Sequence, residues 1–82
     1  MAVQGKNILG KRIQALRKAA KPRVSQEDLV ARLAARGIYL DRTGLARIEN
    51  EDRFLRDYEI EAIAKALKVP VADLFKRGSY AQ

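Results

Sequence analysis

The sequence of 82 residues contains no cysteine and no histidine. These two absences exclude zinc-finger ligands, thiol nucleophiles, imidazole bases and any disulfide framework. No apolar run approaches the roughly 18 to 20 residues needed to cross a bilayer, and the N-terminus lacks the apolar segment of a signal peptide. We therefore expect a soluble, cytoplasmic protein that needs no cofactor. Because no nucleophile–base pair or metal cluster is visible, we do not expect an enzyme.

Acidic side chains are absent from the first 24 residues, which carry seven basic ones. Residues 25 to 82 contain ten basic and ten acidic side chains, so the net charge of +7 arises entirely from the N-terminal segment. A basic block of this kind attracts polyanions, nucleic acid first and an anionic membrane second, although it can also be an ordinary solvated helix face. Membrane binding is disfavoured because the segment lacks bulky aromatic anchors.

The chain has room for one small domain, and the spacing of its apolar residues predicts that this domain is all-α. The pattern predicts five helices, over residues 7–20, 26–36, 41–50, 57–67 and 70–75. No strand alternation competes with these helices. We expect an ordered core over about residues 7–76 and frayed termini.

Several polar residues are placed to cap the predicted helices. Ser25 and Asp28 have the spacing of a capping box, and Gly37 is suited to a left-handed C-cap. The remaining N-caps are expected at Asn7, Asp41 and Asp57.

Two connections carry large apolar side chains. Ile38, Tyr39 and Leu40 follow the second helix and are interpreted as filling the core, although the Tyr39 hydroxyl could instead reach a phosphate. Phe54 and Leu55 follow the third helix and need burial somewhere in the protein or in a dimer.

The third predicted helix has two distinct sides. Leu45 and Ile48 share one side, and the helical wheel places residues 42, 46, 50, 43 and 47 in that order around the other. One side is therefore expected to pack and the other to be free for binding. We interpret Gly44 as a site of close packing against the second helix.

Four segments occur in the order LGKRIQALRKA, SQEDLVARL, LDRTGLARIEN and DYEIEAIAKALKVPVADLF. Together they resemble the helix-turn-helix domains of the Cro and phage-repressor type, the XRE family, over about residues 9–75. The resemblance implies a compact five-helix fold like that of lambda repressor, with the third helix in the DNA major groove. Two features differ from the family pattern. The turn before the third helix is longer, which leaves the register of that helix open, and Glu51 stands where the family commonly has glycine.

The resemblance also implies roles for individual residues. Base contacts fall to Arg42, Thr43 and Arg47, since arginine can bond both O6 and N7 of guanine; the alternative is contact with phosphates or simple solvation. Arg17 and Glu49 match an ion pair between the first and third helices, with two independent surface charges as the alternative. Gln26 resembles the family residue that bonds a phosphate and often supports a side chain of the third helix, and Asn50 and Arg53 match positions near the DNA backbone. The charge of the basic segment, apart from the resemblance, assigns further backbone contacts to Lys11, Lys18, Lys21 and Arg23.

These patterns together predict a sequence-specific regulator of transcription that binds double-stranded DNA. A homodimer acting as a repressor on a palindromic operator is expected, because one recognition helix reads only a few base pairs. The dimer contact is assigned to Val71, Leu74 and Phe75 or to Phe54 and Leu55, with core packing as the alternative. Two other functions stay open: an antitoxin or other repressor controlled by a protein partner, and a helix-turn-helix scaffold that serves as a protein-interaction module.

Overall fold

The computed structural model describes residues 5–76, and all the regular structure within this range is helical. The helices are α1 (Gly10–Ala19), α2 (Gln26–Ala34), α3 (Arg42–Glu49), α4 (Asp57–Leu67) and α5 (Val71–Leu74). The prediction of an all-α, five-helix fold is confirmed. The fraying expected at residues 1–4 and 77–82 lies outside the described residues. Within residues 5–76, no helix has the length and apolar character required to span a bilayer.

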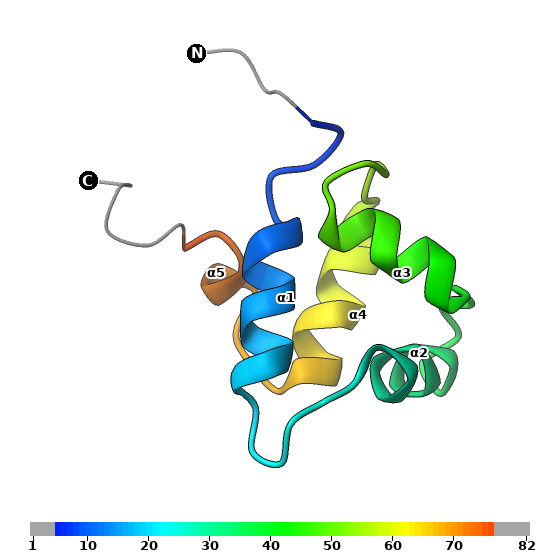
Figure 1. The fold of residues 1–82 in the computed structure, drawn as a ribbon, viewed down its shortest axis with the longest axis vertical. Helices are drawn as coiled ribbons and strands as arrows, with labels where there is room; N and C mark the ends of the chain where they lie inside the picture. Colours follow the sequence, from blue (N-terminus) through cyan, green and yellow to red (C-terminus); the bar gives the residue numbers. More distant parts are fainter. Residues whose placement is uncertain (1–4, 77–82) are drawn as a thin grey trace.

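Helices α1 and α4 pack side by side in the middle of the molecule (Figure 1). Helix α3 packs on α1, α2 packs on α4, and α2 and α3 also contact each other. The short α5 contacts α4, and Figure 1 shows it beside α1, on the side away from α3. Every helix contributes at least one fully buried aliphatic side chain to the core, namely Ile13, Leu29, Leu33, Leu45, Ile48, Ile63 and Leu74.

The expected caps of α2 and α3 are confirmed. The Ser25 hydroxyl accepts a hydrogen bond from Asp28 N, and the Asp28 carboxylate accepts one from Ser25 N, both at 3.0 Å. The bond from Ser25 N holds the pKa of Asp28 below its usual value. At the start of α3, Asp41 accepts from Gly44 N at 2.7 Å. Gly37 has a φ of 83°, as a left-handed helix end requires.

The caps of α1 and α4 differ in detail from the prediction. Asn7 caps the N-terminal turn of α1 by accepting from the N–H groups of Leu9 and Gly10, although the helix itself begins only at Gly10. The expectation that Asp57 caps α4 is wrong, because the N-cap is Arg56. Glu59 reaches back to accept from Arg56 N at 2.9 Å, which fixes the helix start one residue earlier.

The prediction that the apolar connection residues are buried is only partly correct. Ile38, Leu40 and Leu55 pack against the core. Tyr39 lies between two inward-facing neighbours and is 81% exposed, and Phe54 is 69% exposed. The Phe54 ring instead contacts Lys6, whose Nζ lies 5.8 Å from the ring centroid.

Lys68 ends α4 with a φ of 62°, in the left-handed region that favours glycine. A residue with a Cβ costs about 1 kcal/mol or more in this conformation. We expect Lys68→Gly to raise the free energy of unfolding by about 1 kcal/mol and the Tm by about 4–8 °C, as measured by thermal melting. Lys65→Gly, in the interior of the same helix, should lower stability by about 1 kcal/mol. A lower Tm in both variants would contradict the explanation.

Candidate nucleic-acid interface

Helix α3 is held by one side and exposed on the other. Leu45 and Ile48 are fully buried, and burial of each side chain contributes about 1.5–3 kcal/mol. Four residues on the opposite side are exposed and form what we call the α3 surface: Arg42, Thr43, Arg47 and Asn50. The buried and exposed sides of α3 are therefore those that the sequence predicts, and the longer turn before α3 does not change them.

A buried ion pair joins α1 to the last residue of α3. Arg17 and Glu49 are 4% and 1% exposed, and Arg17 Nε and Nη2 donate to the two Glu49 carboxylate oxygens at 2.7 and 3.0 Å. Arg17 Nη1 also donates to Val24 O at 3.0 Å, which ties in the loop before α2. The expected pair is present, and its two-pronged geometry is the strong form of the arginine–carboxylate interaction.

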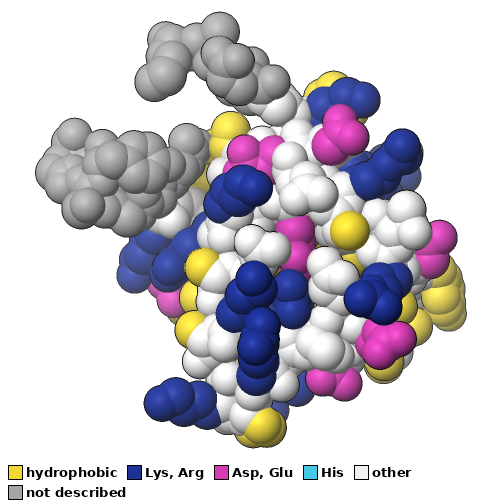
Figure 2. All heavy atoms as spheres, in the orientation of Figure 1, with side chains coloured by type: hydrophobic (Ala, Val, Ile, Leu, Met, Phe, Trp, Pro, Cys, Tyr) yellow, Lys and Arg dark blue, Asp and Glu magenta, His cyan; other side chains and the backbone are white. Residues whose placement is uncertain are grey.

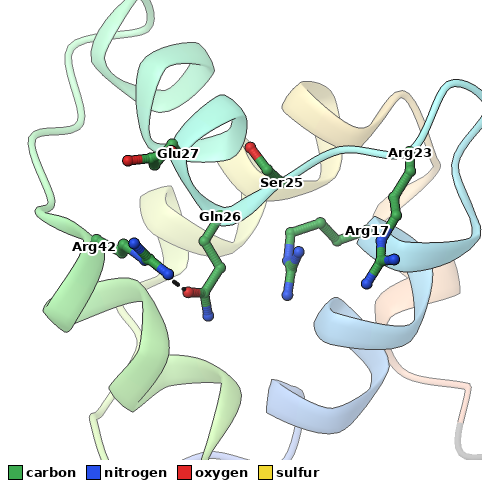
Figure 3. A pocket seen from close by; sticks show the side chains of 6 residues that line it. All are labelled: Arg17, Arg23, Ser25, Gln26, Glu27 and Arg42. Carbon is green, nitrogen blue, oxygen red and sulfur yellow. Dashed lines mark hydrogen bonds between the residues drawn. The ribbon is translucent and has the colours of Figure 1, made fainter.

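Gln26 connects this buried pair to the exposed side of α3. Its Nε2 donates to Glu49 Oε1 at 3.1 Å. Its Oε1 accepts from Arg42 Nε at 3.3 Å, the bond drawn as a dashed line in Figure 3. These partners fix the orientation of the amide, since a carboxylate needs a donor and a guanidinium needs an acceptor. A chain of polar contacts therefore runs from Arg17 through Glu49 and Gln26 to Arg42.

A recess of about 300 Å³ opens beside this chain, where α2 begins. In Figure 3 the Arg42 and Gln26 side chains point toward each other, and Arg17 and Arg23 lie on the side of α1. Arg23 is exposed, whereas Arg17 is held by Glu49. The recess lies at the N-terminus of a helix and is bordered by the exposed cations Arg23 and Arg42 and by one exposed carboxylate, Glu27.

The basic residues predicted to contact a DNA backbone are exposed on α1 and the loop that follows it. They are Lys11, Lys18, Lys21 and Arg23. Figure 2 shows dark blue Lys and Arg side chains spread over the face that carries α1 and α3, with fewer acidic side chains between them. The N-terminal charge excess therefore adjoins the exposed side of α3.

Arg53 is predicted to contact the DNA backbone, but its guanidinium is largely engaged within the protein. Its Nη1 and Nη2 donate to the two Glu59 carboxylate oxygens at 3.1 and 3.0 Å, and Nη1 also donates to Phe54 O. Arg53 lines a second recess of about 350 Å³ together with Thr43 and Arg47. It lies beside the α3 surface with few donors left for a phosphate.

The same contacts make Glu59 sensitive to acid. Burial acts to raise the pKa of its carboxyl, but the bonds from Arg53 and from Arg56 N, together with both positive charges, outweigh burial and lower the pKa. A lowered folded-state pKa contributes stability above the unfolded value of about 4.3, and this stability is lost as the pH falls toward the folded value. We expect Glu59→Gln to unfold at a lower temperature than wild type at pH 7.

The difference in Tm between Glu59→Gln and wild type should narrow as the pH falls through about 4.3 and below, because Glu59 of the unfolded chain then takes up a proton that the folded state, with its lower pKa, binds only at still lower pH. Thermal melts of both proteins at a series of pH values measure this. Glu61→Gln, which removes an exposed carboxylate from the same helix, serves as the control. A difference in Tm between wild type and Glu59→Gln that stays constant down to pH 3 would refute the lowered pKa of Glu59.

Glu51 adopts the conformation that glycine would have at its position. Its φ is 62°, so the end of α3 keeps a left-handed turn in spite of the missing glycine. The Glu51 carboxylate accepts from Lys11 N at 3.2 Å, and its carbonyl accepts from Lys6 N at 2.8 Å. These bonds tie the start of α1 to the end of α3 and offset the backbone strain.

Two glycines behave differently from the sequence interpretation. A Cβ on Gly44 would meet Asp41 Oδ1 and Leu40 and not α2, so the assigned packing against α2 is wrong. Gly10 was missed as a packing residue, although a Cβ there would lie 2.2 Å from Ile48 O. The sequence alone does not reveal this close approach, because it depends on how α1 packs against the end of α3.

Comparison with protein-family models, curated proteins and solved structures found no match for this chain. The functional interpretation therefore depends on the α3 surface, the polar chain behind it and the adjoining basic residues.

Proposed function

We propose that this protein binds double-stranded DNA in a sequence-specific manner and regulates transcription, acting as a repressor when it occupies an operator. The observation that carries the proposal is the α3 surface, an exposed polar helix face that begins with Arg42 and is fixed from behind by Leu45 and Ile48. An α-helix fits the major groove of B-DNA, where arginine and threonine side chains can bond base edges.

The arrangement of α2 before α3 supports the same proposal. In helix-turn-helix proteins the first helix crosses the DNA backbone while the second enters the groove. Here the N-terminus of α2 lies beside α3, and Gln26 joins the two through Arg42. The resemblance to the Cro and phage-repressor type is consistent with this pairing of helices.

The charge distribution supports binding to phosphates. Lys11, Lys18, Lys21 and Arg23 are exposed, and the chain carries a net charge of +7. If about four cations per protomer contact phosphates in a dimer, log affinity should fall against log salt with a slope near −7, at about −0.9 per contact.

We propose a homodimer on two related half-sites about 34–36 Å apart, because a single α3 reads only a few base pairs. Among the residues considered for the dimer contact, Leu74 is fully buried and belongs to the core. Phe54, Val71 and Phe75 are each more than 40% exposed and are the candidates that could meet a second copy.

Selection from a pool of random duplexes tests the proposal. The purified protein should enrich one half-site, repeated in inverted orientation, and sedimentation of the complex should give two chains per duplex. Failure to enrich any sequence would contradict DNA reading and favour a protein-interaction module. A single chain on a palindromic duplex would contradict the dimer alone.

A further inference from the structure

A second basic cluster lies away from the α3 surface, at the C-terminal ends of α2 and α4. We call it the α2/α4 recess; it has a volume of about 480 Å³ and is lined by Arg32, Ala35, Arg36, Lys65, Ala66 and Lys68. Three of its four cations are exposed. The fourth, Arg32, donates to Ala66 O at 2.9 Å.

Ordinary helix-end electrostatics explain only part of this cluster. Cations are favoured near the negative C-terminal end of a helix, and Arg32 satisfies a carbonyl of α4. Arg32 alone fills that role, yet Arg36, Lys65 and Lys68 also line the recess. The carboxylate of Glu61 approaches Lys65 at 3.9 Å, and both side chains are more than half exposed, so it neutralises little of the positive charge.

The α2/α4 recess and the α3 surface have no residue in common. Gln26, next to the α3 surface, is the first residue of α2, whereas Arg36 lies two residues beyond Ala34, the last residue of α2. At 1.5 Å per residue, the eight steps from Gln26 to Ala34 correspond to about 12 Å along the helix. Half of the lining comes from the α4 region, which contributes nothing to the α3 surface. A ligand of the recess therefore need not be the ligand of α3.

The lining indicates which kind of ligand fits. Small-molecule sites are mostly apolar and enclosed, whereas this recess has only two alanines among four cations. Protein interfaces are poor in lysine and use aromatic or methionine anchors, which are missing from this lining. Nucleic-acid interfaces are polar and strongly positive. Exposed lysine and arginine side chains can bind phosphates without an enclosed pocket.

We propose that the α2/α4 recess binds the phosphate backbone of a second nucleic-acid duplex without reading its sequence, so that one chain can hold two duplexes. This activity goes beyond the proposed function. The recess itself needs no base reading by α3, but the holding of two duplexes by one chain rests on the proposed function, in which the α3 surface binds the first duplex.

A bridging experiment tests the proposal. A duplex is attached to beads and loaded with protein, and the beads are then exposed to a free fluorescent duplex of unrelated sequence at low salt. The wild-type protein should capture the free duplex. Arg36→Gln/Lys68→Gln should capture roughly tenfold less, with a salt slope smaller by about 1.8, as expected for two lost phosphate contacts.

The matched control is Arg56→Gln/Lys76→Gln, which removes two exposed positive charges outside both surfaces and should capture the free duplex like wild type. Equal capture by the recess variant and wild type would overturn the proposal, because the second duplex would then be held by another surface or by the α3 of a second copy. Stronger displacement by polyglutamate than by unlabelled duplex would also overturn it and would identify the ligand as an acidic protein segment.

Discussion

Glu49→Gln is expected to lower the free energy of unfolding by about 3–5 kcal/mol, because it leaves the Arg17 guanidinium charged and buried without a counter-ion. Glu49 is 1% exposed and accepts three hydrogen bonds, two from Arg17 and one from Gln26. A glutamine has the same shape but only one acceptor oxygen, and its amide N–H groups would face the donors of Arg17. The loss of stability therefore has two causes, a buried charge without a counter-ion and amide donors that face the donors of Arg17.

Thermal melting measures this effect. For a domain of this size each kcal/mol corresponds to about 4–8 °C, so the Tm should fall by at least about 12 °C. Glu61→Gln removes the same charge from an exposed, weakly paired site and should change stability by less than about 0.5 kcal/mol. If Glu49→Gln and the control melted at the same temperature, the pair would have no structural importance.

Replacing both partners separates the cost of a stranded charge from the value of the pair. An ion pair replaced by apolar residues of similar size is often neutral or even stabilising. Arg17→Met/Glu49→Met should therefore recover much of the stability that Glu49→Gln loses. Gln26 would still lose one partner, so recovery need not be complete.

The sequence predicts the fold well wherever a local pattern determines the structure. Ser25 with Asp28 and Asp41 determine where α2 and α3 begin. The spacing of Leu45 and Ile48 determines which side of α3 packs, and hence which residues form the α3 surface. These features depend on residues within one or two helical turns of each other, and the sequence spacing of such residues predicts them directly.

Features that depend on several elements at once were less predictable. Gln26 contacts Glu49 and Arg42, which belong to another helix, and no spacing reveals that one amide serves both. Tyr39 and Phe54 are large apolar residues in connections, and whether such a residue is buried depends on the space left between helices. The engagement of Arg53 by Glu59 likewise requires the path of the loop between α3 and α4.

The polar chain also links stability to the proposed recognition of DNA. Arg42 is oriented by Gln26, which is held by Glu49, so disturbing the buried end is expected to disorder the exposed end. Arg47 has no such support, and among the described residues it forms none of the salt bridges. The two arginines should therefore respond differently to Gln26→Ala. A contact of Arg42 with DNA should weaken, and a contact of Arg47 with DNA should not.

Arg47→Ala is expected to weaken binding to the selected operator by about 1–3 kcal/mol, or roughly 5- to 150-fold, if its fork bonds a guanine. Arg42→Ala should have an effect of similar size. Binding to a scrambled duplex should change much less, because that binding depends on phosphates. The Kd for both duplexes at one fixed salt concentration measures the loss of discrimination.

Arg47→Lys sharpens this test, because lysine keeps the positive charge but lacks the planar fork. It should bind the scrambled duplex like wild type and still lose much of the preference for the operator. Arg56→Ala, an exposed arginine outside the α3 surface, controls for the loss of one charge. Equal weakening of operator and scrambled duplex by Arg47→Ala, with full rescue by Arg47→Lys, would mean that Arg47 binds a phosphate and that base reading belongs to other residues of α3.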